Sequence, residues 1–266
     1  MERLVVIGRL FFAAAFIGLG VEHFIFREFV SGRAPAWPAA IPGRMIWAYL
    51  TGAVFIIASI AVIIGKKARQ ALVLAGALIL VWALLRHLPV VAADSLFAST
   101  WTRAGKALAF FGGAWALAGT LPKTNGERRS ALARFVNLGR EFVLIGRICL
   151  ATFLLITGVQ HFLHTPFVAT LIPAWFPGDP VFWTYFAGVA LLAGGLGLLI
   201  SWTAPLAALL AGTMVFSWFW IIHIPRTFLS VSDSIAVFEA LAVSGIAFGI
   251  GGFMSAARRH AMESAA

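Results

Sequence analysis

Residues 8–24, GRLFFAAAFIGLGVEHF, return 138 positions later as residues 146–162, GRICLATFLLITGVQHF. Both stretches open with Gly-Arg, continue through a long apolar run and end with a histidine followed by a phenylalanine. In a single sequence, an internal repeat lets each copy serve as a control for the other. Positions that both copies keep are constrained more tightly than the apolar background, so we expect functional residues among them.

Shorter motifs extend this repeat along the chain. The Pro-Ala-Trp segment at residues 35–37 returns at residues 173–175, and the match resumes after a two-residue change of spacing. The positions matched at the second spacing are Trp47, Tyr49, Gly52, Gly76, Trp82, His87 and Pro89 with Trp183, Tyr185, Gly188, Gly212, Trp218, His223 and Pro225. The repeat therefore keeps histidines at two places in each copy.

The composition is that of a membrane protein. Hydrophobic residues make up 61% of the 266 residues, charged residues make up 11%, and the mean hydropathy is +0.96. A soluble domain carries about a quarter charged residues. Long apolar runs predict helices, because a backbone in hydrocarbon must satisfy its own hydrogen bonds, and barrel strands would alternate instead.

We predict an all-α membrane protein with eight transmembrane helices. The predicted spans are residues 4–24, 45–64, 70–90, 104–121, 141–163, 181–201, 204–224 and 233–253. Four spans per copy is an even number, so the copies run in the same direction, as two parallel four-helix-bundle repeats. The predicted units are residues 1–121 and 141–255, with a basic linker at 122–140 and a tail at 256–266.

The net charge of +10 is concentrated on alternate loops. Lysine and arginine gather at residues 66–69, 123–140 and 258–259, and fewer lie in the opposite loops. Positive loops favour the cytoplasmic side, so we expect a multi-pass inner-membrane protein with both termini inside and membrane lipids as partners. Charges spread over short loops do not predict nucleic-acid binding. The single cysteine, Cys149, excludes an internal disulfide and is interpreted as a packing residue.

This topology places the repeated histidines at one face, predicted to be extracytoplasmic. His23 and His161 end the first and fifth spans, and His87 and His223 end the third and seventh. His164 follows one turn beyond His161. The sequence therefore predicts a histidine-rich layer at the outer face.

The Pro-Ala-Trp segments lie in the first loop of each half, over the same face. Proline restricts the backbone, so we expect these loops to form ordered lids. For Trp37 and Trp175 the repeat favours packing of the lid and contact with a ligand equally.

Four polar side chains within the spans differ between the copies. Glu22 is replaced by Gln160, and Lys106 aligns with Glu239. Acidic residues inside a membrane usually have a partner or a task. We predict that Glu22 pairs with Lys106 and that Glu239 stays free to meet Gln160 or a histidine of the second copy.

Three interpretations of the histidines remain open. They cap helix ends, where the helix dipole favours their charged form. Alternatively, they line a pocket for a polar headgroup such as a quinone, or they ligate a metal or haem iron. His161 and His164 have the spacing of a chelating pair, but Phe26 stands at the matching position of the first copy, which excludes a symmetric pair of such sites. We assign no metal ligand, and quinone is the candidate cofactor.

These motifs resemble those of the DoxX-like integral membrane protein family. Its members look like four-helix units with Gly-x-x-His-Phe ending the first helix, Pro-x-Trp in the next loop, an aromatic-x-Tyr-x-x-Gly pattern opening the second helix and a histidine ending the third. The matching stretches are residues 20–24, 35–37 and 47–52 with His87, and residues 158–162, 173–175 and 183–188 with His223. The resemblance implies a tandem duplication, whereas the common member has a single unit. It also implies a quinone-facing or redox-partner role, because better-described members resemble membrane subunits of oxidoreductase systems.

We therefore expect a redox-associated membrane subunit with a quinone- or partner-facing pocket near the extracytoplasmic face and a redox protein partner on that side. The residues expected to handle protons as catalytic groups are His161, His223 and Glu239. The residues expected to bind the ligand are His23, His87, Glu22, Gln160, Trp37, Trp175 and His164. The alternatives are a non-catalytic binder or transporter of a small amphiphile or metal, and a scaffold subunit of a membrane complex.

Overall fold

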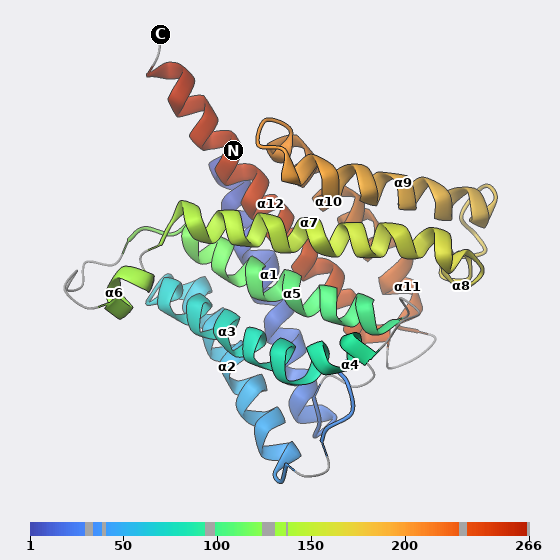
Figure 1. Ribbon diagram of the computed structural model, residues 1–266, viewed down its shortest axis with the longest axis horizontal. Coiled ribbons are helices and arrows are strands. Elements are labelled where there is room, and N and C mark those ends of the chain that lie inside the picture. The colour runs from blue at the N-terminus through green and yellow to red at the C-terminus, as the bar shows by residue number, and fades with distance from the viewer. Residues whose placement is uncertain are drawn as a thin grey trace.

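The fold is built from helices (Figure 1). The computed structural model describes residues 1–29, 34–38, 41–93, 99–123, 131–136, 138–228 and 233–264, and every regular element within those ranges is helical. The prediction of an all-α protein is confirmed.

Within these described ranges, seven helices are long and apolar enough to cross a membrane. Three in the first half are α1 (Glu2–Ile25), α2 (Arg44–Ile64) and the continuous run of α3 (Ala68–Trp82), the π-helix η1 (Ala83–His87) and α4 (Leu88–Ala93). Four lie in the second half. Three of these are α7 (Arg140–Leu163), α9 (Pro180–Leu199) and α12 (Asp233–Glu263). The fourth is a continuous run formed by α10 (Ala204–Trp218), the π-helix η2 (Phe219–His223) and α11 (Ile224–Arg226). These helices confirm the expectation of a multi-pass membrane protein.

The fourth predicted span corresponds to α5 (Ser99–Gly119), which is not among the seven. With 21 residues it is long enough, but it carries Arg103 and Lys106 in its first half and begins before the predicted residue 104. The remaining helices are short: α6 (Ala131–Val136), in the predicted linker, and α8 (Thr165–Ala169). Residues 124–130 and 137 of that linker lie outside the described ranges.

The long helices pack in the same order in each half. In the first half α1 packs on α2, α2 on α3, and α3 on α5. In the second half α7 packs on α9, α9 on α10, and α10 on α12. The most extensive contacts of all join the halves, α1 to α12 and α5 to α7, while α5 and α12 meet each other between them (Figure 1).

Glycines allow the two halves to approach closely. A Cβ atom added at Gly8 on α1 would lie 2.5 Å from the carbonyl oxygen of Gly245 on α12. At the equivalent contact, a Cβ atom added at Gly146 on α7 would lie 2.4 Å from the carbonyl oxygen of Gly112 on α5. Membrane helices associate by close packing rather than by the hydrophobic effect, so small residues at these crossings determine how near the helices come.

Each half also contains one π-helix at the same place. The Leu88 N–H bonds to the Ala83 carbonyl in η1, and the Ile224 N–H bonds to the Phe219 carbonyl in η2, five residues back in each case. Proline follows directly in both, at Pro89 and Pro225. Proline has no N–H and its ring crowds the carbonyl four residues earlier, so widening the preceding turn relieves the clash.

Arg69 attaches the first half to the linker. Its buried guanidinium donates to the carbonyl oxygens of Val136 at 2.7 Å, of Leu121 at 2.5 Å and of Leu138. These acceptors follow the end of α5 or lie in and after α6, where helical carbonyls lack partners of their own. Pro205 stands at the matching position of the second half, so this attachment is present in one copy only.

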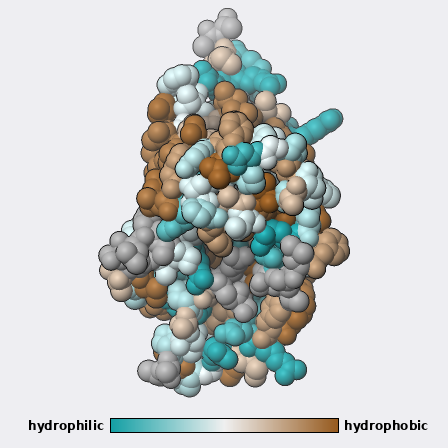
Figure 2. Space-filling view, turned by 90° about the vertical axis from the view of Figure 1, so that its right-hand side faces the viewer, coloured by the Kyte–Doolittle hydropathy of each residue, from teal (hydrophilic) through white to brown (hydrophobic). Residues whose placement is uncertain are grey.

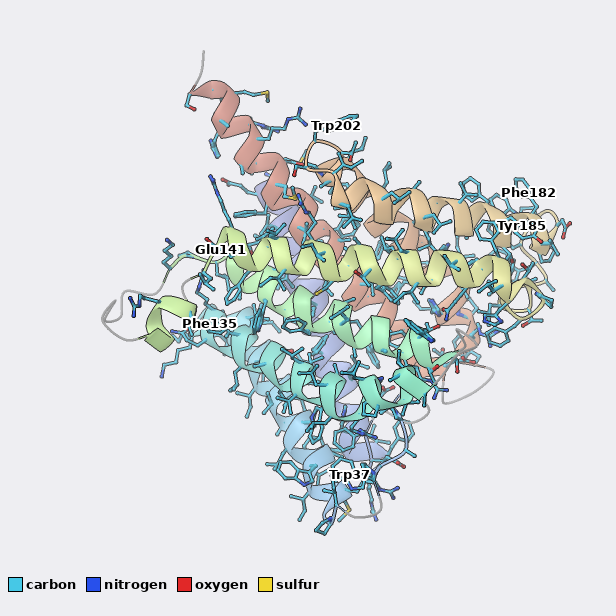
Figure 3. All side chains as sticks on the ribbon, in the orientation of Figure 1. Trp37, Phe135, Glu141, Phe182, Tyr185 and Trp202 are labelled. Carbon is cyan, nitrogen blue, oxygen red and sulfur yellow. The ribbon has the colours of Figure 1, made fainter. Side chains whose placement is uncertain are left out.

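Both chain termini lie on one side of the molecule, and the outer ends of the two halves point apart on the other (Figure 1). Trp202, in the α9–α10 turn, lies on the side of the termini, whereas Trp37 marks the outer end of the first half and Tyr185 that of the second (Figure 3).

The glycine contacts predict a strong difference between two small substitutions. Gly146→Ala places a methyl group against backbone and should lower the free energy of unfolding by about 1–3 kcal/mol. Gly194→Ala is the matched control, because its Cβ would meet Leu154 and Ala211 side chains at 3.5 and 3.7 Å, ordinary contact distances. It should be neutral or slightly stabilising. Unfolding in mixed micelles followed by circular dichroism measures both, and equal losses would contradict the crossing geometry.

Candidate functional site

His23 and His161 occupy equivalent places at the ends of α1 and α7. The Nδ1 atom of each lies 2.7 Å from the carbonyl oxygen four residues earlier, that of Leu19 or of Thr157. Because a carbonyl oxygen only accepts, Nδ1 carries the proton and donates. In the neutral ring, Nε2 then holds the lone pair and can accept a hydrogen bond or a proton.

The two histidines differ in access. His23 is 2% exposed and lies edge-on to the rings of Phe29 and Phe55, with centroids 5.9 and 5.7 Å away. His161 is only partly buried and stacks on Trp218, with centroids 6.3 Å apart and an interplanar angle of 23°. The outer end of the second half is therefore the more open one.

The outer end of the first half is closed by a group of rings that we call the aromatic cluster: Phe29, Trp37, Trp47 and Trp82. Phe29 stacks on Trp37 at 5.2 Å, and Trp82 meets Phe29, Trp37 and Trp47 edge-on at 5.1, 5.8 and 6.0 Å. The Trp82 Nε1–H donates to the Thr51 hydroxyl at 3.1 Å, and the Trp37 Nε1–H donates to the Ile41 carbonyl at 2.6 Å. Within the described part of this loop, residues 34–38, Trp37 thus takes part in packing, one of the two roles that the sequence favoured for it.

Arg86, on η1, lies against this cluster. Its Cζ atom is 4.4 Å from the centroid of Phe29 and 5.2 Å from that of Trp37. Its Nη2 donates to the carbonyl oxygen of Pro35 in the lid. Arg86 is not among the predicted site residues, although it stands next to His87 and is replaced by Ile222 in the second copy.

Trp175 has a different environment from Trp37. It is 63% exposed and contacts Phe176 edge-on, with centroids 5.8 Å apart. Phe176 in turn meets Trp183, whose Nε1–H donates to the Pro177 carbonyl at 2.7 Å. The two Pro-Ala-Trp segments therefore share a sequence but not a packing arrangement.

Polar side chains within the spans form a buried layer between the halves. The Ser234 hydroxyl of α12 donates to Glu22 Oε1 of α1 at 2.7 Å, and the Thr102 hydroxyl of α5 donates to Gln160 Oε1 of α7. Every one of these contacts joins one half to the other. Glu22 and Gln160, both predicted to bind a ligand, contribute to this interface.

Lys106 and Glu239 complete the polar layer as an ion pair, with Nζ and Oε2 2.5 Å apart and both side chains largely buried. The prediction that Glu239 stays free is wrong, because Lys106 forms an ion pair with it. The physical reason is the direct packing of α5 on α12, which brings the two aligned positions face to face. Glu239 is therefore engaged by a lysine and is not an isolated proton acceptor.

The other predicted histidines lie around the same outer ends. His87 and His223 are the last residues of η1 and η2, and both are partly buried. His164 joins α7 to α8, and its carbonyl accepts from the amides of Phe167 and Val168, each at 3.0 Å. Among the described residues, no group of three or more His, Cys, Asp or Glu side chains is placed to hold a metal ion.

The side of the molecule that bears α4, α8 and α11 has both hydrophilic and hydrophobic surface (Figure 2). Hydrophilic and intermediate residues lie across it, and apolar residues border it. That pattern fits helix ends that emerge from an apolar layer.

Comparison with known proteins adds one match. A family model described as a domain of unknown function, DUF8561, matches residues 150–244, from within α7 to within α12. No curated protein and no solved structure is significantly similar to the chain. The matched segment contains the outer end of the second half. The description of the family gives no activity for it.

The ion pair predicts a non-additive mutational cycle. Lys106→Met leaves the Glu239 carboxylate buried without its lysine and should lower the free energy of unfolding by about 3–5 kcal/mol. Lys106→Met with Glu239→Leu removes both charges and should recover most of that loss. The exposed pair of Arg44 and Glu28, at 3.3 Å, is the control, and Arg44→Met should cost less than about 1 kcal/mol. A double variant as unstable as the single one would refute a coupled pair.

Proposed function

We propose that this chain is a tandem DoxX-like membrane protein that faces quinone at the outer end of its second half. In this proposal each half is a parallel four-helix repeat, both termini are cytoplasmic in an inner membrane, and a redox protein docks on the outer side. The observation that carries the proposal is the stack of His161 on Trp218 with the His161 Nδ1–H already bonded to Thr157.

His161 has the chemistry to recognise the reduced form of a quinone. Its Nδ1–H is occupied, so the neutral ring presents Nε2, which accepts but does not donate. A quinol hydroxyl donates, whereas a quinone carbonyl only accepts. The neutral site should therefore bind the quinol more tightly, and Trp218 supplies an apolar ring face beside the histidine.

The two halves divide this role unequally. His23 has the same Nδ1 bond but is sealed among Phe29 and Phe55. A headgroup reaching His23 would have to displace those rings, whereas His161 is accessible without such a change. His223 at the end of η2 is proposed as the second proton-handling group, in agreement with its place near the same end.

The proposal predicts that one histidine matters for quinol and its copy does not. Short-chain quinol and the corresponding quinone are titrated into the protein in neutral detergent, with binding read from thermal stability and tryptophan fluorescence. The wild-type protein should prefer the quinol. His161→Phe should weaken quinol binding roughly tenfold, the value of about one hydrogen bond, and lose the preference for the reduced form.

His23→Phe is the matched control and should bind quinol as the wild type does. Equal losses in the two variants would attribute the effect to helix packing. No saturable binding by the wild-type protein would reject the quinone role and leave a scaffold or a binder of another amphiphile.

A further inference from the structure

Arg86 carries a charge that nothing in the described protein balances. The residue is 7% exposed and lies within an apolar helical run that is long enough to span a membrane. Of the five N–H donors of a guanidinium, a single one is used by a described acceptor, the Pro35 carbonyl. Its buried Nε–H has no acceptor within the described part of the chain.

No described carboxylate pairs with Arg86. Glu28 contributes an attractive charge at a distance, but its own carboxylate bonds to Arg44 at 3.3 Å. The Phe29 and Trp37 rings lie near the guanidinium and offer cation–π contact, which stabilises a cation without using its N–H groups. A buried charge with unused donors is expensive, and ionisable groups inside membranes usually serve a ligand or a partner.

We propose that Arg86 forms an oxyanion site at the outer end of the first half, which takes a phosphate or carboxylate group through the Nε–H edge of the guanidinium. Such groups accept two parallel bonds from arginine, and the bonds are strengthened by charge on both sides. The aromatic cluster borders the site with an apolar wall, which suits the hydrocarbon chain of an anionic amphiphile. This site lies in the other half from His161 and does not depend on the quinol role.

The lid connects binding to the rest of the first half. Pro35 and Trp37 belong to the same segment, and Arg86 holds one through its carbonyl and faces the ring of the other. An oxyanion that accepts from the Arg86 Nε–H binds the same guanidinium that donates to the Pro35 carbonyl. It therefore either displaces that carbonyl or is held beside it. Binding should therefore be reported by the tryptophan fluorescence as well as by stability.

The test uses the full-length protein in a neutral maltoside detergent. Dodecyl phosphate is titrated as the anionic amphiphile, dodecyltrimethylammonium as its cationic counterpart, and inorganic phosphate as the free anion. We expect dodecyl phosphate to raise the melting temperature in a saturable manner, and the cationic surfactant not to do so. Arg86→Gln should weaken the apparent affinity by roughly tenfold or more.

Arg27→Gln is the matched control, because Arg27 is exposed at the same end of α1 and its loss changes the net charge equally. It should retain the response. Arg86→Lys keeps a cation but lacks the Nε–H edge, so it should bind more weakly than the wild type even if the glutamine variant fails to fold.

The outcomes separate the sources of the anion. A response to dodecyl phosphate alone assigns the site to a lipid-like headgroup, and an equal response to inorganic phosphate assigns it to a free oxyanion. A wild-type protein that responds to neither, or an Arg86→Gln protein that responds as the wild type does, overturns the proposal. The quinol titration is read separately, since His161→Phe leaves Arg86 intact.

Discussion

Backbone-to-backbone approach at two glycine crossings sets the geometry of the whole molecule. Gly8 meets Gly245 where α1 crosses α12, and Gly146 meets Gly112 where α7 crosses α5. In lipid, apolar side chains gain nothing by leaving one apolar surface for another, so close packing supplies the driving force. The two crossings use equivalent glycines of α1 and α7. Because both bring the halves together, α5 and α12 come into direct contact. Larger residues at these positions would separate the halves.

That contact determines the chemistry of the interior. Lys106 and Glu239 stand at aligned positions of the two copies, and they become partners only because their helices pack on each other. Glu22 and Gln160 also bond across the interface, to Ser234 and Thr102 respectively. Sliding one half over the other would break these bonds in a medium that offers no water to replace them. The polar layer therefore fixes the relative register of the halves, while the outer ends remain free to differ.

The sequence predicts the local structure well and the contacts between halves poorly. The apolar runs and the repeat predict the helices correctly, because these features depend on neighbours along the chain. His23 and His161 lie in the last turns of α1 and α7 as expected, whereas the helical runs continue beyond His87 and His223 to Ala93 and Arg226. Arg103 and Lys106 make α5 more polar than the other long helices, which composition alone could have flagged. The Lys106–Glu239 pair depends on which helices meet across the repeat, and no pattern within one copy contains that information. The π-helices and Arg86 were missed as well. The sequence signal for the π-helices was the proline two residues after His87 and after His223. The signal for Arg86 was a charge that its counterpart, Ile222, lacks.

The outer ends of the two halves differ in packing, and positions 86 and 222 are among the places where their sequences differ. η1 and η2 put Arg86 and Ile222 at matching places, so the backbone frame is shared and the side chain varies. A guanidinium there bonds to the lid and attracts aromatic faces, and Phe29 is 6% exposed. The side chain of Ile222 has no hydrogen-bond donor, and Phe167, which matches Phe29, is 66% exposed. At this position the first end therefore carries a guanidinium that bonds to the lid, and the second carries an aliphatic side chain. The same order of helix contacts in the two halves thus supports outer ends that differ in packing.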